Sequence, residues 1–379
     1  MSEKIDDILS AAVASGLVPN AVAVAADENG LIYESAHGPR AVGEAEPVTT
    51  GSQFRIMSMV KIMTATAVMQ LVERGNVDLD APVADYRPEF DDVNVLEGFA
   101  GNEPVLRPPA TRATVRQLLS HTSGLSYWFF NESIARWEAA TGTPNISTGS
   151  AEIFAAPMVS DPGTAIEYGI GFDWLGLVVE SVSGQRLDAY LWENVTGPLG
   201  MTETTFLPSQ DALARCVPIH VRDADRRWQP TTIELNQKPD YLSGGSAMYS
   251  TPQDFLKFQR MLLGGGVLDG VQVLERATVQ EIFSSQTGEL FFPQHVKTAD
   301  PTMSFDLSFG AGNKWGLGLM LNSLHTAGLR AAWSGFWAGV ANTYFWVDPA
   351  SRLTGALYTQ ALPFADPSVL QLFEDFERA

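Results

Sequence analysis

The sequence predicts an α+β fold built as two subdomains. Its 379 residues exceed the roughly 250–300 residues that a single hydrophobic core usually serves. Near the N-terminus, the apolar run 21–26 and the β-prone run 31–35 flank the turn formers of 27–30, which predicts a β-hairpin. Near the C-terminus, apolar runs at 341–347 and 353–359 flank an Asp-Pro turn and indicate adjacent antiparallel strands.

Helical periodicity fills much of the chain between these strands. Apolar residues recur at helical spacing, and glycine, proline or a cap residue marks where these segments begin or end. Two further strand-like runs, 315–321 and 331–339, precede the C-terminal strands, whereas 77–83 is expected to be extended and polar. The predicted helices span residues 5–16, 54–74, 114–120, 173–182, 187–192, 254–263 and 369–378.

Composition excludes several classes of function. The formal net charge of −20 disfavours binding to nucleic acid or to anionic membrane surfaces. A single cysteine, Cys216, excludes an intrachain disulfide, and Cys216 with His220 provides too few ligands for a metal site. The polar segment 1–9 and the lack of a membrane-spanning apolar run favour a soluble, cytoplasmic protein. Glycines 310 and 312 lack the strand–helix context of a dinucleotide site, so no cofactor is predicted.

The most informative segment is the predicted helix 54–74, which places Ser58 and Lys61 one helical turn apart. Residues 62–72 are apolar or small on nearly every face, so we expect the helix to be buried. Burial disfavours an ammonium ion, and a neutral Lys61 could take the proton of Ser58 and activate it as a nucleophile. No other lysine follows a serine at this spacing. The alternative is a chance match, because S-x-x-K is a short motif.

Three other groups of residues are candidates for a site. His121, in the run Leu-Leu-Ser-His-Thr-Ser-Gly-Leu, is interpreted as ordering its loop, since the chain has no G-x-S-x-G nucleophile motif. Tyr168 precedes a predicted helix and is either a half-buried tyrosine or a phenol that shares a proton with Lys61. The aromatic run 127–130 is either core or the wall of an apolar substrate pocket.

Taken in order, these motifs resemble those of the serine β-lactamase and penicillin-binding-protein superfamily. The chain carries the Ser58-x-x-Lys61 helix, the His121 run, a Pro-Gly segment leading to Tyr168, and then Trp333-Ser334-Gly335. It looks like the class C β-lactamases and, more nearly, the family VIII carboxylesterases, with related acyltransferases that acylate polyketide alcohols.

The resemblance covers nearly the whole chain and implies a fold. That fold is an antiparallel sheet flanked by helices, with an all-helical domain inserted into it. We therefore expect residues 1–55 and 226–379 to form the domain that holds the sheet. Residues 56–225 would form the mostly helical domain, which carries the nucleophile helix.

The resemblance also implies roles for individual residues. Ser58 would be the acylated nucleophile, and Lys61 with Tyr168 would be its proton-transfer pair. The backbone N–H groups of Ser58 and Phe336 would form the oxyanion hole. The third motif would supply part of the substrate site, together with an aromatic wall that includes Phe336. The implied substrate-binding residues are Tyr127, Trp128, Phe129, Trp333, Ser334, Gly335 and Trp337.

Two departures from the β-lactamase pattern bear on the substrate. The second motif reads Tyr168-Gly169-Ile170, without the asparagine that would bind an amide side chain. Trp333 stands where a cation would pair with a β-lactam carboxylate. Because such a charge-assisted contact is worth about 1.5–3 kcal/mol, its loss weakens recognition of a carboxylate. Both changes favour a neutral ester.

The sequence therefore predicts a serine carboxylesterase that cleaves a small-molecule ester through an acyl-serine intermediate. Transfer of the acyl group to an alcohol instead of water stays open at this point. The alternatives are a β-lactamase or D-Ala-D-Ala-type peptidase or amidase, and a non-enzymatic binding protein that kept the fold. The natural ester and the oligomeric state are not determined by the sequence.

Overall fold

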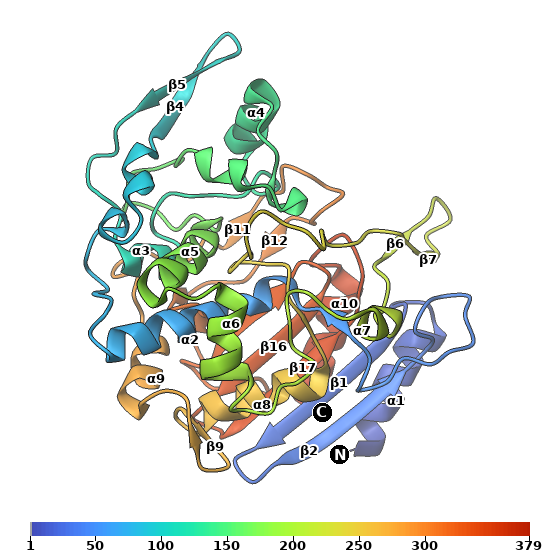
Figure 1. Ribbon diagram of the computed structural model, residues 1–379. Helices are drawn as coiled ribbons and strands as arrows, with labels where there is room; N and C mark the ends of the chain where they lie inside the picture. The colour runs from blue at the N-terminus through green and yellow to red at the C-terminus, as the bar shows by residue number, and fades with distance from the viewer. Residues whose placement is uncertain (1) are drawn as a thin grey trace.

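The structure, a computed structural model, describes residues 2–379 and is organised around one seven-stranded sheet (Figure 1). The strand order is β13-β14-β15-β16-β17-β1-β2, and every neighbouring pair is antiparallel. The hairpins expected near the two ends of the chain are both confirmed. The seven strands are β1 (Ala21–Asp27), β2 (Leu31–His37), β13 (Asn313–Trp315), β14 (Met320–Asn322), β15 (Gly335–Gly339), β16 (Thr343–Asp348) and β17 (Leu353–Tyr358).

The first two strands complete a sheet that the last part of the chain builds. β1 pairs with β17, with Val22 opposite Tyr358 and Asp27 opposite Leu353. In Figure 1 the blue strands β1 and β2 accordingly lie beside the red strands β16 and β17. Because both ends of the chain share one sheet, the middle of the chain leaves the sheet and returns to it.

Each face of the sheet packs against its own helices. Even-numbered residues 22–26 of β1 belong to the core on one face, and odd-numbered residues 21–25 belong to the core on the other. The second face is covered by α1 (Ser2–Ala14) and α10 (Pro367–Arg378), which also contact each other. The first face is covered by α8 (Pro252–Leu263), which packs on β1 and β17.

The middle of the chain supplies further helices, and Figure 1 shows those coloured cyan and green gathered at one side of the sheet. α2 (Val60–Glu73) packs against α5 (Gly171–Ser183) and α6 (Leu187–Leu191) within the same core as the first face of the sheet. A π-helical turn, Trp192–Thr196, continues α6. The other α-helices are α3 (Val115–Leu119), α4 (Glu132–Thr141), α7 (Gln210–Ala214) and α9 (Arg276–Ile282).

Short elements connect these helices. Several two-stranded pairs lie outside the main sheet: β3 (Phe54–Arg55) with β8 (Tyr249–Ser250), β4 (Val95–Ala100) with β5 (Glu103–Arg107), β6 (His220–Arg222) with β7 (Trp228–Pro230), β9 (Val267–Leu268) with β10 (Val271–Gln272), and β11 (His295–Val296) with β12 (Leu307–Ser308). The 3₁₀ turns are Met57–Met59, Val83–Asp85, Pro88–Asp92, Ile146–Thr148 and Ala151–Ala155.

The segment that carries Ser58 differs from the predicted helix 54–74. Phe54–Arg55 form β3 and pair with β8, Met57–Met59 form a 3₁₀ turn, and only Val60–Glu73 form α2. Tertiary hydrogen bonds hold the start of the segment extended, since the backbone N–H of Arg55 donates to the side chain of Gln360. Met57 then adopts a left-handed φ of 47°, which is incompatible with a continuous right-handed helix.

Three smaller predictions also need correction. Segment 77–83 is a turn that leads into a 3₁₀ turn, and the run 315–321 divides into the end of β13 and the start of β14. The run 331–339 becomes a strand only at Gly335. The β4–β5 hairpin was not predicted, because most of its residues are not buried and therefore show no strand-like apolar alternation.

Two sequence-based expectations concern the molecule as a whole. None of the helices found between residues 2 and 379 has both the length and the apolar character needed to span a membrane. The division into 1–55 with 226–379 and 56–225 stays a prediction. Residues 56–225 contain α2 to α7 together with the β4–β5 hairpin.

Candidate active site

Ser58 lies on the wall of an apolar cavity of about 270 Å³. It occupies the 3₁₀ turn that precedes α2, directly after the left-handed Met57, which also lines the cavity. A non-glycine residue in this conformation costs on the order of 1–3 kcal/mol, so the surrounding packing must hold the turn. Ser58 is partly exposed whereas Lys61 is fully buried, so the serine is the part of this pair that a ligand can reach.

Lys61 brings the serine together with two groups far away in sequence. Its Nζ lies 3.1 Å from Ser58 Oγ, 3.1 Å from the Tyr127 hydroxyl and 2.6 Å from the carbonyl oxygen of Gly245. Burial lowers the pKa of Lys61, and the nearby Asp173 carboxylate opposes this shift. The neutral amine is therefore available at a lower pH than in an exposed lysine, as the S-x-x-K interpretation requires.

Tyr168 and Trp337 form the other side of the polar cluster. The indole Nε1–H of Trp337 donates to the Tyr168 hydroxyl at 2.9 Å. Lys61 Nζ lies 4.8 Å from the centre of the Tyr168 ring. Burial raises the pKa of Tyr168 above its ordinary range, against hydrogen bonds from Ser58 and Trp337 that lower it. Tyr168 is therefore a neutral phenol that holds a transferable proton beside Ser58.

The loop that contains His121 is ordered by hydrogen bonds, as the sequence predicted. The backbone N–H of Gly169 donates to His121 Nδ1 at 3.5 Å, and the imidazole packs 4.5 Å from the Tyr168 ring. Burial lowers the pKa of His121 far below its ordinary value, so the ring is neutral. His121 thus supports the position of Tyr168 and does not form a pair with Ser58.

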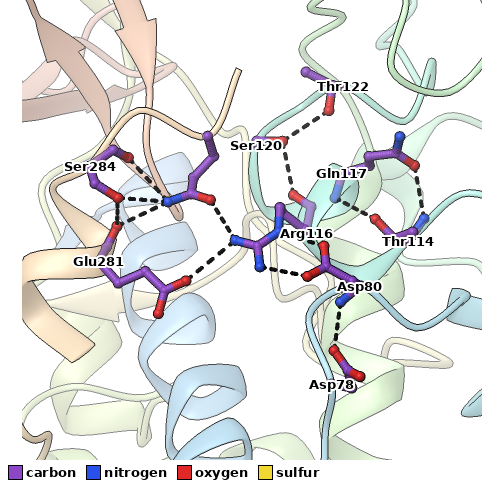
Figure 2. Close-up of polar contacts among 10 residues, drawn as sticks. Asp78, Asp80, Thr114, Arg116, Gln117, Ser120, Thr122, Glu281 and Ser284 are labelled. Atoms are coloured by element: carbon purple, nitrogen blue, oxygen red, sulfur yellow. Dashed lines mark hydrogen bonds and ion pairs between the residues drawn. The ribbon is translucent and has the colours of Figure 1, made fainter. Parts of the chain in front are cut away.

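Polar contacts fix the helix that leads into this loop. Figure 2 shows Arg116 of α3 between Asp80 and Glu281, the latter from α9. The Ser120 hydroxyl donates to the carbonyl of Arg116 and also contacts Thr122 (Figure 2). These contacts tie α3 to two distant segments and so anchor the loop that continues to Tyr127.

The structure contradicts the predicted place of the third motif. Trp333 is 47% exposed and lies at a separate surface hollow, with Arg276 and Arg352. The hydroxyl of Ser334 donates to Asn322, and Gly335 is paired within the sheet, so neither of them lines the Ser58 cavity. The equivalent pattern Trp337-Ala338-Gly339 occurs four residues later, and its tryptophan makes the contact with Tyr168. The repeated W-x-G pattern was a signal that the sequence interpretation missed.

The oxyanion hole predicted from Phe336 is contradicted for the same reason. Phe336 lies between β14 and β16, opposite Met320 and Trp346, so its N–H faces a neighbouring strand rather than the cavity. Val340, the first residue after β15, lines the cavity together with Ser58. Within residues 2–379, neither the Ser58 N–H nor the Val340 N–H donates to a backbone carbonyl. These two free donors are the ones that a bound oxyanion could meet.

The aromatic run contributes to the cavity and to the core at once. Tyr127, Trp128 and Phe129 all line the cavity, yet Tyr127 and Phe129 are almost fully buried. The run is therefore part of the core and also lines the cavity, and its role in binding a substrate stays a prediction. Much of the remaining wall is aliphatic and comes from segments that carry no recognisable motif, which is why sequence reasoning did not find it. It includes Ile146, Ile219, Ile233, Leu235, Val340 and Leu362.

A family comparison agrees with this geometry. The protein family described as Beta-lactamase matches residues 5–375. The chain belongs to the β-lactamase family. Two members of this family are similar to the chain along nearly their whole length. Lovastatin esterase of Penicillium rubens is 31% identical, covering 94% of this chain and 92% of the relative. Monacolin J acid methylbutanoyltransferase of Aspergillus terreus is 32% identical, covering 97% and 92%.

Solved structures of similar proteins have the same fold as this chain. Unliganded simvastatin synthase from Aspergillus terreus superimposes with a TM-score of 0.83 at 29% identity, covering 99% of this chain and 96% of that one. EstCE1, a hydrolase with promiscuous acyltransferase activity, has the same fold, with a TM-score of 0.80 at 21% identity over 100% and 98% of the two chains. The β-lactamase-like sheet flanked by helices is confirmed.

The second motif of this β-lactamase-family chain is closely packed. A Cβ on Gly169 would lie 2.4 Å from the carbonyl oxygen of Leu125 and from the Cα of Ser126, so only glycine fits there. Ile170 is buried and immediately precedes α5. The position that would carry an amide in the β-lactamase pattern is therefore occupied by an apolar side chain of the core.

Proposed function

We propose that this protein is a serine esterase that forms an acyl-enzyme at Ser58 and passes the acyl group to water or to an alcohol. One observation carries the proposal: a fully buried Lys61 contacts the hydroxyl of a partly exposed serine on the wall of an apolar cavity. The similarity to a lovastatin esterase and a monacolin J acid methylbutanoyltransferase supports the same chemistry.

Acylation begins with the transfer of the Ser58 proton to neutral Lys61. The resulting alkoxide attacks the carbonyl carbon of the ester, and negative charge develops on the carbonyl oxygen. The N–H groups of Ser58 and Val340 stabilise this oxyanion, because neither is committed to a backbone carbonyl. Such a donor typically contributes on the order of 10²–10³ to kcat.

Collapse of the tetrahedral intermediate requires a proton on the departing alcohol oxygen. Tyr168 supplies it, because the buried phenol is protonated and lies beside Ser58. The Trp337 indole donates to the phenol oxygen and orients it, and it also stabilises the phenolate formed during the transfer. In deacylation the same groups act in reverse on the incoming water or alcohol.

The cavity favours neutral substrates. None of the residues between 2 and 379 that line it is a lysine or an arginine, and its one carboxylate, Glu234, is already paired with Arg55. A substrate carboxylate would be desolvated there without a cationic partner. An apolar group instead gains about 25 cal/mol for each Å² that is buried. The β-lactamase and peptidase alternatives are disfavoured by this chemistry.

The proposal is tested by trapping the acyl-enzyme. Wild-type protein incubated with a short chromogenic ester should show one acyl adduct by intact mass, and peptide mapping should place it on Ser58. Ser58→Ala should lose the adduct and on the order of 10⁴-fold or more in kcat. Ser246→Ala, a second serine of the same cavity wall, should still be acylated on Ser58. An adduct on another serine, or activity retained by Ser58→Ala, would refute the proposal.

A further inference from the structure

Lys61 is buried without an ion pair. It has no exposed surface, and no carboxylate within the described chain lies within 4.0 Å of its Nζ. Its three hydrogen-bond partners, Ser58, Tyr127 and the carbonyl of Gly245, are all uncharged. Moving a lone ammonium into a protein interior is strongly unfavourable. Something else in the fold must allow Lys61 to accept a proton during catalysis.

Asp173 is the carboxylate whose charge acts on Lys61. It lies in the first turn of α5 and is fully buried. Its Oδ1 accepts a hydrogen bond of 2.5 Å from the hydroxyl of Ser243. Its Oδ2 is also buried and has no hydrogen bond of good geometry within residues 2–379, although the Gly245 backbone and the Tyr241 hydroxyl lie close to the carboxylate. Leaving a buried carboxylate oxygen unsatisfied is costly, so its retention calls for a functional account.

Gly245 shows how closely Asp173 approaches the catalytic lysine. A Cβ on this glycine would lie 2.8 Å from Asp173 Oδ2, 3.1 Å from the Tyr127 hydroxyl and 3.4 Å from Lys61 Nζ. The Oδ2 of Asp173 and the Nζ of Lys61 therefore both lie beside Gly245, although they are too far apart for a direct ion pair. The carbonyl of the same glycine accepts from Lys61, so Gly245 contacts both partners.

The other ionisable groups around the pair are neutral. Burial raises the pKa of Tyr127, Tyr168 and Tyr241 above their ordinary range, and the Asp173 charge adds to each shift. Burial lowers the pKa of His121 far below its ordinary value, and the charge of Lys61 adds to this shift. Asp173 is thus the group that can balance a positive charge on Lys61.

We propose that Asp173 is the positioning and counter-charge residue of Lys61, acting across Gly245 and held in place by Ser243. It does not touch the substrate. When Lys61 takes the proton of Ser58, the negative charge of Asp173 attracts the new ammonium and so stabilises the protonated base. The inference rests on the proposed esterase function, because it assigns to Asp173 the task of supporting the base of that reaction.

The test is the pH profile of kcat/KM for a neutral ester, measured with Asp173→Asn. An opposite charge nearby favours the charged form, so removing it lowers the pKa of Lys61. Neutral Lys61 is the active form, and the acidic limb of the profile should therefore move to lower pH, by about one unit or more. The weaker base should also lower kcat, by about tenfold.

Two further variants keep the test decisive. Ser243→Ala removes the hydrogen bond that stabilises the carboxylate, and should move the acidic limb in the same direction by a smaller amount. Asp254→Asn is the matched control, because Asp254 is a buried aspartate in the first turn of α8, where it pairs with Lys257. Asp254→Asn should lower the melting temperature and leave the pH profile unchanged.

The outcomes separate this inference from the proposed function. If wild-type protein forms the Ser58 adduct but Asp173→Asn and Ser243→Ala keep the wild-type profile and kcat, Asp173 has no such role and the esterase assignment stands. If Asp173→Asn does not fold, an unshifted profile in Ser243→Ala alone overturns the inference. If Ser58→Ala remains active, the proposed function itself is wrong.

Discussion

The hydrogen-bond partners of Lys61 restrict how its proton can move. The carbonyl of Gly245 can only accept, whereas the hydroxyls of Ser58 and Tyr127 can both donate and accept. A neutral amine has two hydrogens and one lone pair. Once Lys61 donates to Gly245, it has one hydrogen and the lone pair left for two hydroxyls. If Tyr127 accepts, Ser58 must donate to the lone pair, which is the arrangement needed for proton transfer.

At the residue scale, the two tryptophans of the repeated W-x-G pattern give a sharp prediction. Trp337→Phe keeps an aromatic ring but removes the indole donor to Tyr168. A net hydrogen bond is worth about 1 kcal/mol, so kcat for a neutral ester should fall about fivefold or more. Trp333→Phe is the matched control, because Trp333 is half exposed and lies outside the cavity.

Steady-state kinetics of both variants, with melting temperatures to verify folding, check this prediction. Trp333→Phe should keep kcat and KM within about twofold of wild type, as expected for a surface substitution. A loss of kcat in Trp333→Phe with none in Trp337→Phe would restore Trp333-Ser334-Gly335 as the third motif.

At the element scale, the end of β15 must approach the turn that carries Ser58. Gly339 makes this approach possible, because a Cβ there would lie 2.5 Å from the carbonyl oxygen of Ile56 and 2.4 Å from Thr343 Oγ1. Val340 follows directly and lines the cavity. The spacing between these two backbones therefore sets the separation of the two proposed oxyanion donors.

Gly339→Ala should force β15 away from the Ser58 turn. Overpacking of this kind costs about 1–3 kcal/mol in stability, and we expect kcat to fall by on the order of tenfold or more as the oxyanion donors separate. Gly51→Ala is a suitable control, because its Cβ would meet nothing closer than Thr49 Oγ1 at 3.8 Å. Thermal melts and ester kinetics on both variants measure the two effects. Unchanged kcat in Gly339→Ala would argue against Val340 as an oxyanion donor.

At the scale of the whole molecule, charge and cavity chemistry act in the same direction. The chain has a net charge of −20, and the cavity beside Ser58 is mostly apolar and offers no free cation among the wall residues that the structure describes, since its wall residue Glu234 already pairs with Arg55. A negatively charged substrate is therefore disfavoured both on approach and after binding, because it meets like charge and then loses its hydration. Neutral esters with an apolar acyl group avoid both penalties.

The corresponding prediction compares three substrates under one set of conditions. The kcat/KM of a neutral aryl ester should be on the order of 100-fold higher than that of the same ester with a terminal carboxylate on its acyl chain. A chromogenic cephalosporin, which also carries a carboxylate, should be turned over more slowly than the neutral ester. The matched esters isolate the effect of the charge. A cephalosporin that is hydrolysed faster than both esters would restore the β-lactamase alternative.

Some parts of the site were predictable because they depend on short stretches of chain. Ser58 and Lys61 are one turn apart in either an α-helix or a 3₁₀ turn followed by one, so their contact survived the error about where the helix begins. The N-terminal hairpin and the amphipathic α10 were likewise predicted from turn residues and periodicity within a single segment. Local spacing fixes local geometry.

Only the tertiary structure decided which of two W-x-G patterns meets Tyr168, and which N–H groups stay free for an oxyanion. Both depend on the register of β15 against β14 and β16 and on where β14 ends. Neither the register nor the end of β14 can be predicted from the residue spacing within β15. The contacts of Lys61 with Tyr127 and Gly245, and its proximity to Asp173, join segments between 61 and 245 in the chain. The sequence by itself predicted the proposed nucleophile and its base and indicated the family of the fold. The packing of distant segments determined the electrostatic environment in which they work, because burial and hydrogen-bond partners belong to the folded chain.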